Sequence, residues 1–166
     1  MREILLTNNK IALVDDGDFE TLSRFKWTAY KKRSTWYAHR TVHASERELL
    51  GGRKSISMHR FLLSHLPTKG IEIDHKNRNG LDNQRENLRV ATRSLNQMNC
   101  GPYKGNKSGY KGVSWRQKGR VIAQIYINTR RVYLGRFDTP EQAARAYDAK
   151  AKELFGEFAY LNFPEG

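Results

Sequence analysis

The chain has 166 residues, enough for one medium domain or two small ones. Its formal net charge is +13, from 30 Lys and Arg against 17 Asp and Glu, so a polyanion is the first partner to consider. The mean hydropathy of -0.78 predicts modest cores, but 11% aromatic residues exclude a disordered chain. Charge alone leaves nucleic acid, an anionic membrane surface and plain solubility open.

Targeting and redox features are few. The amino-terminal run MREILLTNNKIALVDD is not apolar enough for a secretory signal, and no later segment approaches the roughly 18 apolar residues of a membrane span. We therefore expect an intracellular protein with no membrane partner. The single cysteine, Cys100, excludes an internal disulfide and a structural zinc site made of paired cysteines.

The first part of the chain predicts a small α+β region. Short runs of β-branched and aromatic residues predict strands at 10–14 and 36–42, and Asp18 followed by FETLSRF predicts a capped helical turn. Residues 21–45 contain no Asp or Glu, but they contain several Lys, Arg, Trp and Tyr residues. This composition favours a basic, aromatic β-surface.

The middle of the chain predicts a β-loop-β-α unit. SISMHRFLLSHLP, residues 55–67, is typical of a short helix that Pro67 ends. A strand (IEID), a polar loop (HKNRNGLDNQRE) and a second strand (NLRVA) follow, and Thr92 is the expected N-cap of the helix RSLNQMN. His59 is interpreted as a packed structural histidine outside the catalytic set.

A Gly- and Lys-rich stretch separates this unit from a second one. We place a linker at 100–109, between a domain at 1–99 and a domain at 110–166. The second domain alternates in strand fashion over GVSW, VIAQIYI and RVYLGRF, and Thr139 then caps the helix TPEQAARAYDAKAKELFG. The predicted fold class is α+β, with a three-stranded antiparallel sheet and one helix in the second domain.

Four residues of the middle unit suit phosphodiester hydrolysis. The reaction needs a hard divalent cation and a base that activates water. Asp74 and Asn96 offer the oxygen ligands that Mg²⁺ prefers, and neutral His75, with an ordinary pKa of about 6.5, can accept a proton from water. Because neighbouring side chains on a strand face opposite sides, we expect the chain to bend between Asp74 and His75.

The run IDHKNRNGLDNQRENLRVATRSLNQMN, within 58–99, resembles the HNH motif, whose fold is a β-hairpin and a helix around one metal ion. The resemblance implies that His75 is the general base, that Asp74 and Asn96 bind the metal, and that Asn87 belongs to the catalytic set and steadies the loop. Asn96 stands where many members carry His. An amide oxygen there favours Mg²⁺ or Mn²⁺ over Zn²⁺.

Residues 100–137 contain nine Lys or Arg and no Asp or Glu, interleaved with Tyr and Trp. This pattern favours nucleic-acid binding, although a solvated sheet face would explain it as well. The signatures YKGV, YLGRFDT, EQAARAYD and LNF then resemble the AP2 domain, which lays a three-stranded sheet in the DNA major groove and backs it with a helix.

The resemblance places DNA-contact positions across the predicted sheet. They are Lys111, Ser114, Arg116, Lys118, Arg120, Gln124, Tyr126, Arg131 and Tyr133. Plant members usually carry Arg at the positions of Ser114 and Tyr126 and Trp at those of Lys118 and Tyr133, so their sequence preference does not transfer. The alanines at 143, 144 and 146 are assigned to close packing of helix on sheet.

The sequence therefore predicts a site-specific endonuclease of double-stranded DNA that uses one Mg²⁺ or Mn²⁺ ion. It resembles the free-standing HNH-AP2 homing endonucleases of phages and bacteria, which implies a cytoplasmic location in a bacterial or phage-infected cell. One centre per chain favours a monomer that nicks one strand, and a dimer stays possible. One alternative is a DNA-binding regulator with a vestigial nuclease centre. Another is an RNA-binding or RNA-cutting protein, which a sheet suited to the wide major groove of B-DNA disfavours.

Overall fold

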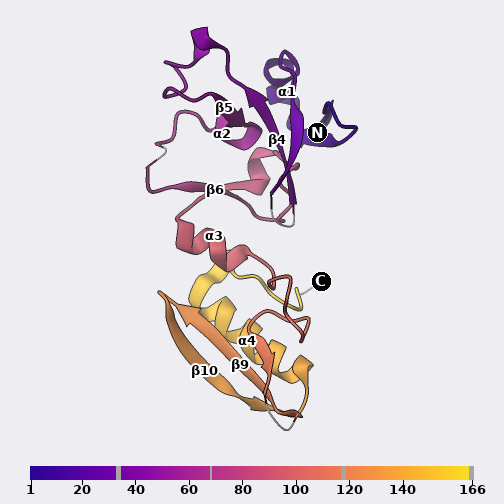
Figure 1. Ribbon diagram of the computed structural model, residues 1–166, viewed down its shortest axis with the longest axis vertical. Helices are drawn as coiled ribbons and strands as arrows, with labels where there is room; N and C mark the ends of the chain where they lie inside the picture. The colour runs from indigo at the N-terminus through magenta and orange to yellow at the C-terminus, as the bar shows by residue number, and fades with distance from the viewer. Residues whose placement is uncertain (33–34, 68, 117–118, 165–166) are drawn as a thin grey trace. The chain divides into compact units, whose positions relative to one another are not determined.

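The computed structural model describes residues 1–32, 35–67, 69–116 and 119–164 and divides into two compact units, Met1–Arg93 and Ser94–Gly166. Both units mix helices and strands, which confirms the α+β class (Figure 1). The division falls before the expected linker at 100–109. Most of the helix expected to close the nuclease unit is therefore grouped with the second unit.

The first unit begins with two small antiparallel sheets. Its first elements are β1 (Arg2–Leu5), β2 (Ile11–Val14), α1 (Asp16–Ser23), β3 (Thr28–Lys32), β4 (Thr35–Thr41), the 3₁₀ helix η1 (Ala44–Glu46) and β5 (Ser55–Ser57). β1 pairs with β2, and the other sheet has the order β3-β4-β5. The predicted strands correspond to β2 and β4, whereas β1, β3 and β5 were not predicted.

Two predicted helices have different bounds in the structure. α1 begins at Asp16 after the N-cap residue Asp15, so Asp18 lies inside the helix, where its carboxylate accepts hydrogen bonds from Arg85 Nε and Nη2 at 2.8 and 2.7 Å. The helix predicted over 55–67 is shorter: α2 covers Met58–Leu62. The residues before it form β5, which pairs with β4, so tertiary pairing overrides the local helical pattern there.

A β-hairpin follows α2. Its elements are β6 (Glu72–His75), the 3₁₀ helix η2 (Arg85–Asn87) and β7 (Leu88–Ala91), and α3 (Arg93–Asn99) comes next. β6 and β7 are antiparallel, with Asp74 opposite Arg89 and His75 opposite Leu88. α3 begins directly after Thr92, as the sequence predicts.

The core of the first unit is centred on Trp27, which is 1% exposed. Its indole N–H donates to the Leu22 carbonyl at 2.8 Å, and its ring meets Phe25 and Phe61 edge-on. Buried indole N–H groups need such an acceptor. Because Phe61 lies on α2, this aromatic cluster fixes α2 against the sheet.

The second unit is a three-stranded antiparallel sheet covered on one face by a helix (Figure 1). It contains β8 (Val113–Trp115), β9 (Val121–Ile127), β10 (Arg130–Phe137), α4 (Pro140–Phe155) and the 3₁₀ helix η4 (Gly156–Phe158). The sheet order is β10-β9-β8. This arrangement confirms the predicted sheet and helix.

Small residues let α4 approach the sheet closely. Ala143 and Ala144 are fully buried against Val121 and Ala123 of β9, as expected for the alanines of this helix. Gly112 has a φ of 78°, and a Cβ at this position would lie 1.9 Å from the Tyr147 ring. Only glycine fits both this backbone and this contact.

Side-chain hydrogen bonds hold the start of α4 and the segment that packs back on it. Thr139 Oγ1 accepts from the Gln142 N–H and the Gln142 side chain accepts from the Thr139 N–H, which is a capping box. Further along, Asp148 accepts from the backbone N–H groups of Asn162 and Phe163 at 2.9 and 2.8 Å. These bonds tie the LNF segment back onto α4.

Candidate active site and DNA-binding surface

Asp74 and His75 end strand β6, and both are buried. The predicted bend between them is wrong, because β6 stays paired with β7 through both residues. Their side chains therefore face opposite sides of the strand. A general base and a metal ligand must both reach the same phosphate, so the joint action of Asp74 and His75 stays a prediction.

The Asp74 carboxylate forms a buried ion pair with Arg89. Arg89 Nε and Nη2 donate to Asp74 Oδ2 at 2.9 and 2.7 Å, and the two side chains are 8% and 6% exposed. Cross-strand register places Arg89 opposite Asp74. A carboxylate buried this deeply keeps its charge only with such a partner.

The His75 imidazole packs among other rings on the opposite side of β6. Its centroid lies 5.0 Å from that of His59 and 5.7 Å from that of Tyr37, both in edge-on geometry. Burial lowers the pKa of His75, while Asn83 and the carboxylates of Asp74 and Asp82 oppose the shift. His75 is therefore neutral at physiological pH, as a general base must be.

His59 and Tyr37 complete this cluster, and the sequence did not place either in the catalytic set. The Ser57 hydroxyl lies 2.9 Å from His59 Nε2, and Nδ1 is buried without a hydrogen-bond partner among the described residues. Burial lowers the pKa of His59 to about 3. His59 is packed, as interpreted from the sequence, but it is packed directly against His75.

Asn87 fixes the loop after His75. Its Oδ1 accepts from the Asn77 N–H at 3.0 Å, and its Nδ2 donates to the Asp82 carbonyl at 2.7 Å. The Lys76 N–H donates to the Asn87 carbonyl at 2.9 Å. An asparagine side chain can satisfy a donor and an acceptor of a loop backbone at once, which holds the loop in one conformation.

Asn96 lies on α3 in the second unit and is half-buried. The described residues contain no group of three or more His, Cys, Asp or Glu side chains that could hold a metal. A buried carboxylate at a strand end, with an amide oxygen as second ligand, nevertheless suits a hard cation that keeps several waters. Asp74 and Asn96 fit a site for Mg²⁺ or Mn²⁺ in their donor chemistry, and their pairing stays a prediction.

Five predicted DNA-contact residues share the sheet face of the second unit that points away from α4. Residues 121, 123 and 125 of β9 are buried under the helix, so the alternate residues face outward. The register then aligns outward residues of neighbouring strands. The five are Ser114, Gln124, Tyr126, Arg131 and Tyr133.

This outward face combines exposed aromatic rings with buried polar atoms. Tyr126 and Tyr133 are 51% and 55% exposed. Ser114 Oγ and Gln124 Oε1 are buried atoms with no hydrogen-bond partner among the described residues. The exposed tyrosine rings are therefore the part of this face that is suited to contact with a nucleic acid.

The other predicted contacts are placed differently. Arg116 and Arg120 are exposed beyond β8 and before β9, joined by a backbone hydrogen bond of 2.7 Å, and Lys118 lies outside the described residues. Lys111 Nζ donates to the carbonyls of Met98 and Cys100, both at 2.6 Å. Its ammonium therefore caps the carboxyl end of α3 in this structure.

Arg136 was not predicted, although it shares the outward face. A register shift between Tyr133 and Gly135 sets Arg136 opposite the outward residue Ile122. Gly135 has a φ of 139°, which side chains rarely tolerate. A glycine inside a strand pattern signals such a bulge, so the sequence contained the clue.

Comparison with known proteins identifies both domains. Residues 65–98 match the HNH endonuclease family, and residues 108–157 match the AP2 domain family. The chain is 32% identical over 151 residues to an uncharacterized HNH endonuclease of Acanthamoeba polyphaga mimivirus, covering 88% of this chain and 75% of the viral protein. The hairpin around His75 and the following helix thus define an HNH-type nuclease unit.

The AP2 region has plant relatives. It is 48% identical over 58 residues to the dehydration-responsive element-binding protein 2D of Arabidopsis thaliana, covering 34% of this chain and 28% of that protein. It is 51% identical over 57 residues to an AP2/ERF and B3 domain-containing protein of Oryza sativa subsp. japonica, covering 34% of this chain and 16% of that protein. The chain thus spans less than a third of either plant protein.

The chain belongs to the HNH endonuclease family and carries an AP2 domain. Both domains indicate DNA as its partner, and HNH nucleases generally use a divalent metal ion. Within the described ranges, no helix combines the length and hydrophobicity needed to cross a bilayer.

Proposed function

We propose that this protein is a metal-dependent, site-specific DNA endonuclease that nicks one strand of the duplex at each visit. The observation that carries the proposal is the buried imidazole of His75 at the end of β6, the strand that also carries the buried Asp74, within a matched HNH unit. The proposed partner is double-stranded DNA. The outward face of the AP2 sheet supports that choice because it carries exposed Arg and Tyr side chains.

Each residue of the nuclease unit has a proposed role. His75 takes a proton from the attacking water, and Asn87 keeps the neighbouring loop in place. Asp74 and Asn96 would hold a Mg²⁺ or Mn²⁺ ion, which supplies charge stabilisation at the phosphate and the leaving oxygen. Arg89 holds the Asp74 carboxylate in one orientation through the buried ion pair.

The test uses a plasmid library with random inserts, because the target sequence is unknown. With Mg²⁺ or Mn²⁺, we expect nicks at one recurring sequence, mapped by sequencing the nicked ends. His75→Ala should abolish nicking and leave DNA binding nearly intact, whereas Arg116→Ala should weaken binding. His65→Ala, at an exposed histidine, is the matched control and should cut normally. Undiminished cutting by the His75 variant would refute the assignment.

The same assay addresses the alternatives. Tight, sequence-dependent binding without nicks in either metal would instead support a DNA-binding regulator with a vestigial centre. Linear product at low enzyme concentration, cut at one recurring sequence, would show that two centres act together. That outcome would contradict the proposal that the enzyme nicks one strand at each visit.

A further inference from the structure

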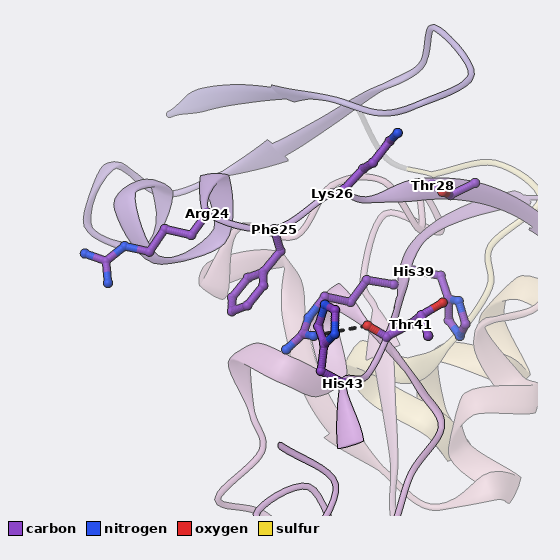
Figure 2. Close-up of a pocket in the computed structure, with 8 residues that line it drawn as sticks. Arg24, Phe25, Lys26, Thr28, His39, Thr41 and His43 are labelled. Atoms are coloured by element: carbon purple, nitrogen blue, oxygen red, sulfur yellow. Dashed lines mark hydrogen bonds between the residues drawn. The ribbon is translucent and has the colours of Figure 1, made fainter. Parts of the chain in front are cut away.

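An open groove in the first unit lies between the segment that leads into β3 and the carboxyl-terminal half of β4 (Figure 2). Its volume is about 500 Å³. In Figure 2, Thr28 and Thr41, with His39 and His43, lie around one open space, whereas the side chains of Lys26 and Arg24 start at its edge and extend away from it. None of the described lining residues is acidic, so the groove is suited to an anion.

The cations of the groove fall into two kinds. Arg40 is used by the fold: its guanidinium bonds both carboxylate oxygens of Glu46 at 3.0 and 2.8 Å and lies 3.9 Å over the Phe25 ring. Arg24 and Lys26 are exposed, and neither forms an ion pair with a described residue. Two long, exposed cationic side chains thus stand at the rim of the groove, where a change of rotamer would bring them to a ligand.

Neutral donors complete the lining. Thr28 Oγ1 accepts a hydrogen bond from Thr7 Oγ1 at 2.9 Å, so its own hydrogen is available to donate. Thr41 adds an exposed hydroxyl. His39 lies opposite Thr28 in the strand register, and burial lowers its pKa, so it offers a ring N–H rather than a charge. Cations combined with hydroxyl and N–H donors are the groups that contact nucleic-acid phosphates.

The groove shares a sheet face with the candidate active site. Tyr37, His39 and Thr41 alternate along β4 and so point to the same side. Tyr37 is in ring contact with His75, whereas His39 and Thr41 line the groove. At about 3.4 Å per residue, Thr41 lies roughly 14 Å along the strand from Tyr37. A duplex rises about 3.4 Å per base pair, so this distance corresponds to roughly four base pairs.

We propose that this groove is a phosphate-binding subsite that holds the DNA backbone about four base pairs from the phosphate being cut. The proposal rests on the nuclease function proposed above and deepens it. It adds a backbone contact in the nuclease unit to those of the AP2 sheet. Because Arg24 and Lys26 contact phosphate rather than bases, the subsite contributes affinity and register without sequence preference.

The experiment neutralises the two exposed cations in the full chain. Arg24→Gln with Lys26→Gln is compared with Lys54→Gln and Lys69→Gln, which removes two charges from exposed lysines outside the groove. All proteins also carry His75→Ala, so that DNA stays intact during binding. Each lost phosphate contact lowers the slope of log K against log salt by about 0.9. The groove variant should therefore bind about 30-fold more weakly at 0.15 M salt, and the control should not.

A footprint separates this proposal from the proposed function. Phosphate-ethylation interference on the bound duplex should show a contact about four base pairs from the nick mapped with the wild type, and the groove variant should lose it. Equal slopes and footprints for groove and control variants would overturn the subsite. A wild type that never nicks, together with a phosphate contact and a salt slope that only the groove variant loses, would overturn the nuclease and leave phosphate binding by the groove standing. Weakening on duplex RNA greater than on DNA would assign the groove to RNA and overturn the proposal.

Discussion

Burial of His59 should make the first unit lose stability in mild acid. The folded protein lowers the pKa of His59 to about 3, whereas an exposed histidine has a pKa of 6.5. Desolvation is the main cause, and the neighbouring charges act in the same direction. Those neighbours are His75, Arg60, Lys32 and His39.

The direction follows from which state binds the proton. Below pH 6.5 the unfolded chain protonates at His59 and the folded chain does not, so stability is complete above pH 6.5 and falls as the pH drops toward 3. Each pH unit in that window is worth about 1.4 kcal/mol. Between pH 7 and pH 5, His59 alone should cost the folded state about 2 kcal/mol.

Urea unfolding followed by tryptophan fluorescence measures this loss. Trp27 is 1% exposed in the core of the first unit, and a Trp115→Phe background removes the signal of the second. We expect His59→Phe to lose about 2 kcal/mol less than the wild type between pH 7 and pH 5. Any difference in the free energy of unfolding that the two proteins already show at pH 8 cancels, because only the change between pH 7 and pH 5 is compared. His65→Phe, at an exposed position, should follow the wild type. Identical losses in the wild type and the His59 variant would refute the reasoning.

Two further predictions concern the second unit. Gly112→Ala should destabilise it by about 3 kcal/mol, because the new methyl group meets the Tyr147 ring. Gly109→Ala, at a similar φ but in open space, should cost only about 1 kcal/mol. Thermal unfolding compares the two variants, and equal losses would contradict the packing argument. Lys111→Met should cost about 1 to 2 kcal/mol by removing the hydrogen bonds to the end of α3, and we expect the salt dependence of DNA binding to stay unchanged. A salt slope lower by about 1 would instead assign Lys111 to a phosphate.

The second unit was predictable because its local signals agree with its packing. Its strands alternate between residues buried under α4 and exposed residues, and the cap Thr139 begins α4 where expected. The exception is β10, where the bulge at Gly135 reverses the alternation and turns Arg136 outward. A strict period of two could not place that residue.

The first unit was less predictable because its strands are short and are defined by their partners. β5 covers only Ser55–Ser57, and it forms because β4 pairs with it, although the same residues suit a helix. The assignment of His75 followed from its motif. Its contacts with Tyr37 and His59 could not be predicted from the motif. Tyr37 comes from β4 and His59 from α2, and no local pattern links these elements before the chain folds.

The candidate site occupies space that a larger domain would fill with apolar side chains. Asp74, His75, Asn83 and Asn87 are all buried, in a unit whose hydrophobic cluster lies around Trp27. Replacing a buried ion pair such as Asp74 with Arg89 by apolar residues is often neutral or stabilising. The ion pair between Asp74 and Arg89 is therefore weak evidence of a role in stability. The burial of these polar groups is better explained by the chemistry proposed for them, which needs a neutral base and an oriented carboxylate that bulk water does not screen.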